Sequence, residues 1–326
     1  MPHDVLCLRP EADFTRVGIT PPVALTIAYR RPDDPGLAAL IRESRALVIP
    51  AVGGKLPGSL FKGSGVKLVQ VTGAGVDRLD EAAMKSLGIP VANVPGGSNS
   101  AVAEYAVACA TFLLRRLGWA DAEIRDANYV SFRGRMLTDN LPGLEGLTVG
   151  VVGLGVIGYA VAEAFHRCGC QIIYHDPAPR DAASTAKIGA KAVPLEELLK
   201  TADIVTLHVP LLPQTRSMIG ARQLTMMKPG AVLIQASRGG IVNETALAAH
   251  LNSGHLAGAA VDVYTAEPPD TDNPLFALEG EAARRVLFTP HVAGVTRQAF
   301  ANLFREAWDN VERVLVKGEA PLNRVY

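Results

Sequence analysis

The sequence predicts an α/β fold built on parallel sheets, and three observations lead to this prediction. Short apolar runs rich in β-branched residues alternate with helical stretches along most of the chain. Such alternation is typical of parallel, doubly wound sheets, because each helix carries the chain back to the start of the next strand. Near the middle of the chain, a glycine-rich turn joins one such strand directly to a helix.

The composition excludes several classes of protein. The chain has 326 residues, enough for two domains, with 48% hydrophobic and 20% charged residues. Lys plus Arg and Asp plus Glu number 32 each, so no basic excess indicates a nucleic acid or a membrane as a partner. We expect no transmembrane helix, no secretory signal and no metal site. The four cysteines indicate thiols rather than disulfides, and a cytoplasmic location is expected.

The first part of the chain, up to about residue 98, reads as a smaller α/β unit. Asp80 is placed to cap its second helix and Gly88 to end it. The turn Gly73–Gly75 is either a plain connection or a nest of N–H groups for a small anion such as a carboxylate, and the residues leave both open. The predicted strands are 5–8, 24–28, 46–49, 67–72 and 89–94, and the helices are 35–45 and 81–87.

The second part begins after a Pro-Gly-rich stretch at residues 95–99. A long helix is predicted from 101 to about 127, capped by Asn99 or Ser100, and residues 128–143 are expected to be irregular. The alternation then continues to the end of the chain. The predicted strands are 148–152, 171–174, 204–209, 231–235, 258–263 and 286–288, and the helices are 156–168, 195–200, 221–226, 244–253 and 296–317.

A G-x-G-x-x-G motif joins the first of these strands to its helix. Gly153 permits the tight turn, Gly155 lets a pyrophosphate approach the backbone, and Gly158 lets the helix pack closely on the strand. The unpaired N–H groups at the helix N-terminus favour phosphates. Strand, turn and helix together predict a dinucleotide-binding unit, and a glycine turn that binds nothing is the less favoured alternative.

Asp176, which follows the next strand, indicates which dinucleotide is bound. An acid at this distance from the glycines can accept hydrogen bonds from the adenosine ribose hydroxyls and repels the extra phosphate of NADP. The sequence therefore predicts NAD. Arg180 is close enough along the chain to offset part of that repulsion.

Three polar residues follow successive strands of the second half: Arg238, Glu267 and His291. Ligands of open parallel sheets bind beyond the carboxyl ends of the strands. Arginine can bind a carboxylate, histidine can donate a proton to a carbonyl oxygen, and glutamate can orient the imidazole and favour its charged form. Each residue alone also fits a surface charge, a loop acid or a hydrogen-bonded strand end. Together they predict hydride transfer to a 2-oxo acid or from a 2-hydroxy acid.

An ordered set of segments then identifies a family resemblance. These segments are VTGAGVDRLD, NVPGGSNSAVAEYAV, GLTVGVVGLGVIG, ADIVTLHVPLLPQTRSMIG, MKPGAVLIQASRGGIVNETAL, GAAVDVYTAEPP and LFTPHVAG. Over almost its whole length the chain resembles the D-isomer-specific 2-hydroxyacid dehydrogenases, such as phosphoglycerate dehydrogenase and glyoxylate/hydroxypyruvate reductase. The resemblance implies a doubly wound parallel-sheet Rossmann domain for NAD, residues 100–294. This domain is inserted into a smaller flavodoxin-like α/β substrate domain, residues 1–99 and 295–326.

The resemblance also implies roles for single residues. Arg238 would bind the substrate, Glu267 would be the partner of the histidine, and His291 would be the proton donor. Ala74 and Gly75 resemble the residues whose N–H groups hold the substrate carboxylate. The implied cofactor contacts are Gly153, Gly155, Val156, Ile157, Gly158, Asp176, Val209, Ala236, Ser237, Gly294 and Asp262, the last facing the nicotinamide carboxamide.

Further implications are a homodimer formed through the cofactor domain and no regulatory domain after Tyr326. The chain departs from the family pattern at Gln235, where Asn is common, and at Asn243, where Asp is common. It also has residues 128–132 where the family often has a Trp. Two functions on the same fold stay open as alternatives: an NADH-sensing corepressor-like protein, and a formate or phosphite dehydrogenase. The sequence does not identify the 2-hydroxy acid.

Overall fold

The structure is a computed structural model that describes residues 3–326. The chain divides into two compact units, Met1–Ser98 with Val295–Tyr326, and Asn99–Gly294. Each unit contains one sheet in which every strand pair is parallel, with helices on both faces. The predicted α/β fold class with doubly wound parallel sheets is confirmed.

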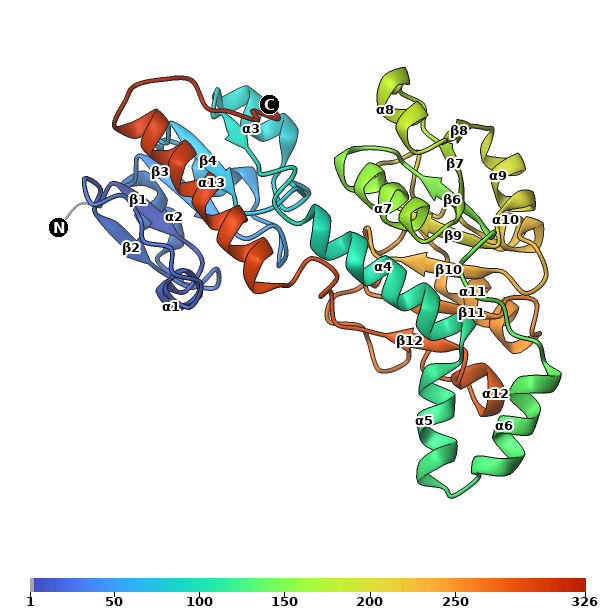
Figure 1. The fold of residues 1–326 in the computed structure, drawn as a ribbon. Helices are drawn as coiled ribbons and strands as arrows, with labels where there is room; N and C mark the ends of the chain where they lie inside the picture. Colours follow the sequence, from blue (N-terminus) through green and yellow to red (C-terminus); the bar gives the residue numbers. More distant parts are fainter. Residues whose placement is uncertain (1–2) are drawn as a thin grey trace. The chain divides into compact units, whose positions relative to one another are not determined.

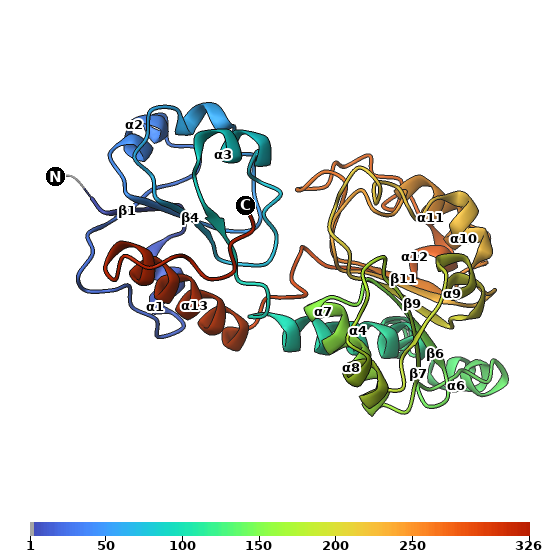
Figure 2. The same ribbon diagram turned by 90° about the horizontal axis from the view of Figure 1, so that it is seen from above.

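The smaller unit contains a five-stranded sheet in the order β2-β1-β3-β4-β5. Figure 2 shows α2 and α3 on one face of this sheet and α1 and α13 on the other. Neighbouring residues of one strand serve opposite faces, because Leu47 packs beneath α2 and α3 whereas Val48 packs beneath α1 and α13. The strands are β1 (Val5–Cys7), β2 (Ile27–Tyr29), β3 (Ala46–Ile49), β4 (Leu68–Val71) and β5 (Val91–Ala92). The helices are α1 (Glu11–Thr15), α2 (Leu37–Arg42), the 3-10 turn η1 (Gly58–Phe61), α3 (Glu81–Leu87) and α13 (Arg297–Leu315).

The larger unit contains a seven-stranded sheet in the order β12-β11-β10-β9-β6-β7-β8. The chain runs outward from β6 in both directions, so the strand order reverses between β6 and β9. Ligands of such sheets bind at this reversal, beyond the carboxyl ends of the strands. The strands are β6 (Thr148–Val152), β7 (Gln171–His175), β8 (Lys191–Ala192), β9 (Ile204–Leu207), β10 (Val232–Gln235), β11 (Gly258–Val261) and β12 (Val286–Phe288).

Helices cover both faces of the seven-stranded sheet (Figure 1). Adjacent residues again face opposite layers, since Val151 packs toward α4 and α7 and Val152 toward α9, α10 and α11. The helices of this unit are α4 (Asn99–Leu114), α5 (Leu117–Arg125), α6 (Tyr129–Thr138), α7 (Val156–Arg167), α8 (Ala182–Lys187), α9 (Leu195–Thr201), α10 (Ala221–Met226), α11 (Glu244–Asn252) and α12 (Gly280–Ala283).

The single helix predicted over 101–127 is wrong, because the chain forms α4 and α5 with a break between them. Arg116 has a φ of 50°, in the left-handed region that ends a helix. Gly118 allows the chain to turn back closely, since a Cβ atom there would lie 2.4 Å from Cζ of Phe112. The break between α4 and α5 therefore depends on the close contact of Gly118 with Phe112, which the apolar periodicity of the sequence does not indicate.

The prediction of an irregular segment over 128–143 is also wrong for most of its length, since Tyr129–Thr138 forms α6. Phe132 is buried against Trp119 of α5, with ring centroids 5.7 Å apart. This tertiary contact stabilises a helix whose sequence has little apolar periodicity. Figure 1 shows α5 and α6 side by side, extending away from the seven-stranded sheet, and we name this pair the α5–α6 hairpin.

Candidate active site

The dinucleotide turn joins the end of β6 to the start of α7. Gly153 has a φ of 89°, which favours glycine, and its N–H donates to the carbonyl oxygen of His175 over 2.8 Å. At Gly158, a Cβ atom would lie 1.9 Å from the carbonyl oxygen of Gly153. No side chain fits at Gly158. Glycine at positions 153 and 158 therefore lets the N-terminus of α7 pack directly against the end of β6.

The N-terminus of α7 fits a pyrophosphate. The N–H of Tyr159 donates to the carbonyl oxygen of Gly155 over 2.8 Å, whereas the N–H groups of Val156, Ile157 and Gly158 donate to no preceding residue of the described chain. A Cβ atom on Gly155 would meet no atom within 4 Å, so the space beside the turn is open. Unpaired N–H groups and the helix dipole both favour an anion at this place.

Asp176 follows β7, and its side chain is only 5% exposed. Its Oδ2 accepts the N–H of Leu154 over 2.7 Å and its Oδ1 accepts the N–H of Ala178 over 2.9 Å. Burial opposes ionisation, but hydrogen bonds from Ala178, Arg180 and Leu154 outweigh it and hold the pKa of Asp176 below its ordinary value. The carboxylate next to the turn is therefore an acceptor suited to ribose hydroxyls.

Three neighbouring strands, β10, β11 and β12, precede the three predicted polar residues. Nδ1 of His291 lies 2.8 Å from Oε2 of Glu267. An ionised carboxylate only accepts hydrogen bonds, so Nδ1 carries the proton and Nε2 is left to exchange a proton with a ligand. The two side chains are 27% and 35% exposed, which leaves them accessible to a small molecule.

Glu267 is held as an anion in this pair. Burial opposes its ionisation, but hydrogen bonds from His291 and the N–H of Tyr264, and the charges of His291 and Arg238, lower the pKa of Glu267 below its ordinary value. The turn that carries Arg238 packs against the chain that leads from β11 to Glu267, since a Cβ atom on Gly239 would lie 1.7 Å from the carbonyl oxygen of Tyr264. The structure thus brings all three predicted polar residues to one region of the sheet edge.

The backbone of His291 has an uncommon conformation. Its φ is 54°, which costs a residue with a Cβ atom roughly 1–2 kcal/mol. Asp262, which is fully buried, stabilises this conformation. Its carbonyl oxygen accepts the N–H of His291 over 2.8 Å, and its carboxylate accepts the N–H groups of Val292 and Ala293 over 2.7 and 2.9 Å. The residue expected to face the carboxamide therefore also anchors the loop that carries the imidazole.

The turn that carries Arg238 is held by Gln235 and Gly239. The buried Gln235 amide donates to the carbonyl oxygen of Arg238 and accepts the hydroxyl of Ser237, both over 2.9 Å. A Cβ atom on Gly239 would lie 1.7 Å from the carbonyl oxygen of Tyr264, so the turn packs directly against the chain after β11. The departure from the family pattern at Gln235 thus lies in a residue that shapes the arginine turn.

The remaining predicted cofactor residues lie near the same strand ends. Val209 follows β9 and packs beside the dinucleotide turn, where a Cβ atom on Gly153 would lie 2.8 Å from its Cγ1. Ala236 and Ser237 follow β10 directly, and Gly294 is the last residue of the larger unit. These positions are compatible with contacts to a dinucleotide lying along the sheet edge.

Ala74 and Gly75 belong to the smaller unit, where they follow β4. The side-chain amide of Asn93 donates to the carbonyl oxygen of Ala74 over 2.7 Å, which fixes the turn. The N–H groups of Ala74 and Gly75 have no hydrogen-bond partner among residues 3–326, and both residues are partly exposed. Of the two readings of this turn, the nest for a small anion therefore has the better support.

Sequence reasoning missed three hydroxyl residues behind the imidazole loop. The Thr289 hydroxyl donates to Oδ1 of Asp262 over 2.6 Å, and the Tyr105 hydroxyl lies 2.7 Å from the Thr289 hydroxyl. The Tyr264 hydroxyl lies 3.1 Å from the carbonyl oxygens of both Val261 and Thr289, between which it shares its one proton, and burial raises the pKa of Tyr264 to about 12. All three lie in segments that carry the family resemblance, but no spacing in the sequence indicates that they are hydrogen-bonded to one another or to the loop.

Other site types receive no support from the described residues. Within residues 3–326, no group of three or more His, Cys, Asp and Glu side chains is arranged to hold a metal ion. No helix in that range has both the length and the apolar character needed to cross a membrane. All four cysteines are free, and Cys7, Cys109 and Cys170 are buried.

A doubly wound sheet with a dinucleotide turn, a ribose-type acid and an imidazole–carboxylate pair at its strand ends is an arrangement typical of nicotinamide-dependent dehydrogenases. Residues 107–293 match the family described as "D-isomer specific 2-hydroxyacid dehydrogenase, NAD binding domain". The D-3-phosphoglycerate dehydrogenase of Archaeoglobus fulgidus is 36% identical over 241 residues, which are 73% of this chain and 43% of that protein. The glyoxylate reductase of Thermococcus litoralis is 36% identical over 264 residues, 80% of this chain and 77% of that one. The chain belongs to the D-isomer specific 2-hydroxyacid dehydrogenase family, and its cofactor is NAD.

Solved structures agree with this assignment. The structure of D-2-hydroxyisocaproate dehydrogenase has a TM-score of 0.81 at 26% identity and covers 98% of each chain. A glyoxylate reductase from Paecilomyes thermophila has a TM-score of 0.83 at 25% identity, with 100% of this chain and 99% of that chain covered. The chain spans about half the length of the phosphoglycerate dehydrogenases it matches, 43% for Archaeoglobus fulgidus and 48% for Mycobacterium tuberculosis.

Proposed function

We propose that the chain interconverts a D-2-hydroxy acid and the corresponding 2-oxo acid, with NAD as the hydride carrier. The observation that carries the proposal is the His291–Glu267 pair, 2.8 Å apart, within range of the charge of Arg238. A proton donor, an anion that favours its charged form and a carboxylate-binding cation are the groups that 2-oxo acid reduction requires. Neither the corepressor-like alternative nor formate or phosphite oxidation is favoured by any contact in the site.

The proposed cofactor contacts are the turn Gly153–Gly158 for the pyrophosphate and Asp176 for the ribose. Val209, Ala236, Ser237, Asp262 and Gly294 would line the remainder of the site. When bound, the cofactor accepts a hydride from C2 of the hydroxy acid or, when reduced, returns one to C2 of the oxo acid.

His291 manages the proton in this proposal. In the direction of reduction, Nε2 of the imidazolium donates a proton to the carbonyl oxygen at C2, and in the direction of oxidation the neutral imidazole accepts it. Glu267 keeps the proton on Nδ1 and stabilises the positive charge of the ring. The left-handed backbone at His291, anchored by Asp262, fixes the position from which the ring acts.

Arg238 binds and polarises the substrate. A planar guanidinium can bond the carboxylate and the neighbouring C2 oxygen together, which orients C2 for hydride transfer. In the smaller unit, Ala74 and Gly75, whose N–H groups have no partner among residues 3–326, are the other residues proposed to bind the substrate. In this scheme residues 1–99 with 295–326 are the substrate domain and residues 100–294 are the NAD-binding domain.

The test compares His291→Gln with His166→Gln, a control at an exposed histidine in the last turn of α7. His291→Gln should lower turnover by at least about 10²-fold, because a proton donor is lost, while NADH binding measured by fluorescence is kept. The control should change neither quantity. The substrates are glyoxylate, hydroxypyruvate, pyruvate and longer 2-oxo acids, each with NADH.

Two results would contradict the proposal. Turnover of His291→Gln within about threefold of wild type would remove the imidazole from the proton transfer. Tight NADH binding with no oxidation by any 2-oxo acid would contradict the dehydrogenase activity itself and would favour a sensor.

We also infer a homodimer. The α5–α6 hairpin exposes large apolar side chains, of which Tyr129, Val130 and Leu137 are 61%, 82% and 66% exposed. A cluster of this kind on a projecting element is typical of a protein interface, and a second copy of the chain is the partner that the family resemblance implies.

A cytoplasmic location is our last inference about function. Four free cysteines, three of them buried, suit a compartment that keeps thiols reduced. Cell fractionation with a marker enzyme for each compartment tests it, and recovery of the protein outside the cytoplasm would contradict it.

A further inference from the structure

A cavity lies at the amino ends of β10, β11 and β12 in the larger unit. Gly230, Ala257 and Arg285, which precede these strands, line it together with the end of α4 and the start of α5. Its volume is about 240 Å³, whereas one water molecule needs roughly 10–15 Å³. Because the strands of this sheet are parallel, the cavity lies at the opposite edge from the dinucleotide turn and the imidazole–carboxylate pair. It is therefore separate from the candidate active site.

Among the described residues that line the cavity, every charged side chain is an arginine, namely Arg116, Arg284 and Arg285. A Cβ atom on Gly254 would lie 2.8 Å from Nη1 of Arg285. The Cζ atoms of Arg116 and Arg284 each lie 5.5 Å from the ring centroid of Trp119. Gly254 and Trp119 also line the cavity, so the three guanidinium groups lie at its wall.

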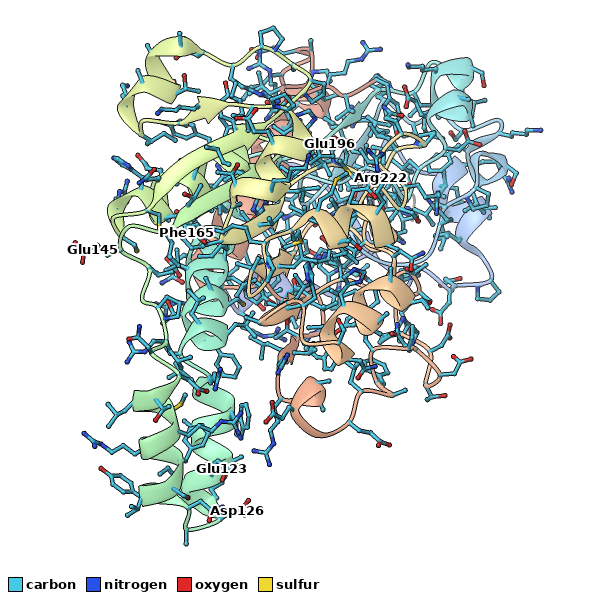
Figure 3. The ribbon with its side chains drawn as sticks, turned by 90° about the vertical axis from the view of Figure 1, so that its right-hand side faces the viewer. Glu123, Asp126, Glu145, Phe165, Glu196 and Arg222 are labelled. Carbon is cyan, nitrogen blue, oxygen red and sulfur yellow. The ribbon has the colours of Figure 1, made fainter. Side chains whose placement is uncertain are left out.

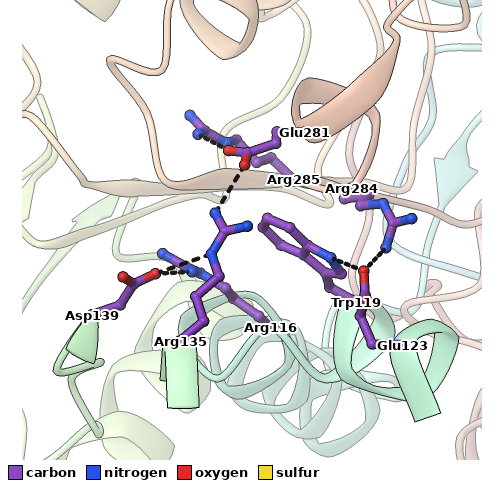
Figure 4. Close-up of polar contacts among 8 residues, drawn as sticks. All are labelled: Arg116, Trp119, Glu123, Arg135, Asp139, Glu281, Arg284 and Arg285. Atoms are coloured by element: carbon purple, nitrogen blue, oxygen red, sulfur yellow. Dashed lines mark hydrogen bonds and ion pairs between the residues drawn. The ribbon is translucent and has the colours of Figure 1, made fainter. Parts of the chain in front are cut away.

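These three arginines have bonding capacity beyond their ion pairs. Each donates to one carboxylate that does not line the cavity (Figure 4). The partners of Arg116, Arg284 and Arg285 are Asp139, Glu123 and Glu281, respectively. A guanidinium has five N–H donors, and only one on each arginine is hydrogen-bonded within residues 3–326. The three side chains are 29%, 38% and 26% exposed, so further donors are accessible to a ligand.

The charges around the cavity do not balance. Arg135 pairs with two of the same carboxylates, those of Glu281 and Asp139. The network therefore contains four arginines and three carboxylates, and it carries one excess positive charge. The carboxyl end of α4, which also borders the cavity, contributes only about half a negative charge. The local charge thus favours an anion in the cavity.

We propose that this cavity binds a small oxyanion, of which inorganic phosphate is the simplest, as a regulatory site of the larger unit. The planar donors of arginine suit the oxygens of such an anion. Arg116 precedes α5, whereas Arg284 and Arg285 follow α12, so an anion that bonds to both groups connects the α5–α6 hairpin to the body of the unit. Occupancy of the site therefore stabilises the attachment of the hairpin.

The test follows phosphate binding through the fluorescence of Trp119. A Trp308→Phe background leaves Trp119 as the only tryptophan, and its ring lines the cavity. Sodium phosphate is titrated at an ionic strength held constant with sodium chloride, because exposed charges are screened by salt. NAD is present in excess, so that phosphate is excluded from the dinucleotide turn. The fluorescence change should saturate with a Kd of about 1 mM or less.

Substitutions in the same background locate the site. Arg285→Gln and Arg284→Gln should each weaken phosphate binding at least about tenfold, because each removes a charge-assisted donor. Arg222→Gln is the matched control, since Arg222 also pairs with a single carboxylate, that of Glu196. Figure 3 shows this pair well away from Glu123 of the hairpin, and Arg222→Gln should leave the Kd unchanged.

A second measurement tests the effect on the hairpin. Saturating phosphate should slow trypsin cleavage after Arg125 and Arg133 about threefold in the parent protein and not in Arg285→Gln, since cleavage reports local opening. Cleavage after the exposed Lys62 of the smaller unit is the internal control for the protease.

Three results would overturn the inference. One is a fluorescence change that sodium chloride alone reproduces or that does not saturate. Another is an equal Kd in Arg285→Gln, Arg284→Gln and Arg222→Gln, which would put the phosphate elsewhere. The third is a rate of hairpin cleavage that phosphate leaves unchanged, which would exclude the connection between the anion and the hairpin. None of these readouts depends on turnover, so they are independent of the proposed dehydrogenase activity.

Discussion

His208, directly after β9, is a residue whose charge state depends on burial at the dinucleotide turn. Its ring Nε2 lies 2.8 Å from the Thr206 hydroxyl, and burial lowers the pKa of His208 to about 4. Its carbonyl oxygen lies 2.6 Å from the place a Cβ on Gly153 would occupy, so its backbone is part of the wall of the turn. The neutral ring packs as a structural group here, and protonation opposes the fold.

The lowered pKa of His208 predicts that the free energy of unfolding depends on pH through this residue. In the unfolded chain a histidine protonates near pH 6.5, whereas the folded value is about 4. The contribution of the neutral His208 to the free energy of unfolding is therefore fully present above pH 6.5, and it is lost as the pH falls from 6.5 toward 4. His208→Asn should lose about 2 kcal/mol less unfolding free energy than wild type between pH 7 and pH 4.5.

Urea unfolding in a Trp308→Phe background measures this loss, because Trp119 then reports on the larger unit alone. His166→Asn is the control at an exposed histidine and should behave as wild type. Equal losses of stability in His208→Asn and wild type would contradict the assignment.

Among the elements, the α5–α6 hairpin depends on a network of charges around one indole (Figure 4). Arg135 lies 4.3 Å from the Trp119 ring centroid, and Arg116 and Arg284 lie 5.5 Å from it. Glu123 accepts the indole N–H over 2.9 Å and pairs with Arg284 over 3.0 Å. Because Arg284 follows α12, these contacts connect the hairpin to the body of the larger unit.

We expect Glu123→Gln to loosen the hairpin, because the amide cannot replace the ion pair with Arg284. Trypsin cleavage after Arg125 and Arg133, followed by mass spectrometry, should accelerate about fivefold, since cleavage reports local opening. Glu196→Gln, which breaks the surface pair with Arg222, is the control and should leave both rates unchanged. A rate in Glu123→Gln equal to that of the control would show that the network does not anchor the hairpin.

For the whole molecule, the inferred homodimer makes a direct prediction at Leu137. Wild type should sediment at twice the 34.4 kDa chain mass. Leu137→Asp should weaken the dimer at least about 100-fold, because an unpaired charge would be buried in the interface. Leu322→Asp introduces the same change at a leucine that is 56% exposed in the smaller unit, and the dimer should persist.

Sedimentation velocity at micromolar concentration distinguishes the possible results. A monomeric wild type would contradict the homodimer. A Leu137→Asp variant that stays dimeric would exclude this part of the hairpin from the interface.

Much of the fold was predictable because local chemistry sets it. The strands 46–49, 148–152 and 286–288 and the helix 81–87 have the predicted bounds, and Asp80 caps that helix by accepting the N–H of Ala83. The break at Arg116 was not predictable, since it depends on the contact of Gly118 with Phe112. Helix α6 was missed because burial of Phe132 against Trp119, and not its own periodicity, stabilises it.

In the candidate site too, strand order made some features predictable from the sequence, whereas features that depend on tertiary contacts were not. Topology alone predicted that Arg238, Glu267 and His291 follow neighbouring strands. The left-handed backbone of His291 and the pairing of Asp176 with Arg180 were not predictable, because both come from hydrogen bonds outside regular structure. The role of Asp262 as an acceptor for three donors of the imidazole loop likewise needed coordinates.

The hydrogen bonds that Asp262 already accepts limit how the nicotinamide carboxamide, which it is proposed to face, can bond to it. A carboxylate has about four lone-pair directions, and the Thr289 hydroxyl and the N–H groups of Val292 and Ala293 occupy three of them. One direction remains, so a carboxamide can present only a single hydrogen to it. Rotation of the carboxamide about its bond to the ring would turn that hydrogen away, so the single free direction would fix the orientation of the carboxamide. The orientation of the carboxamide would then follow from the number of free acceptor directions on one buried side chain.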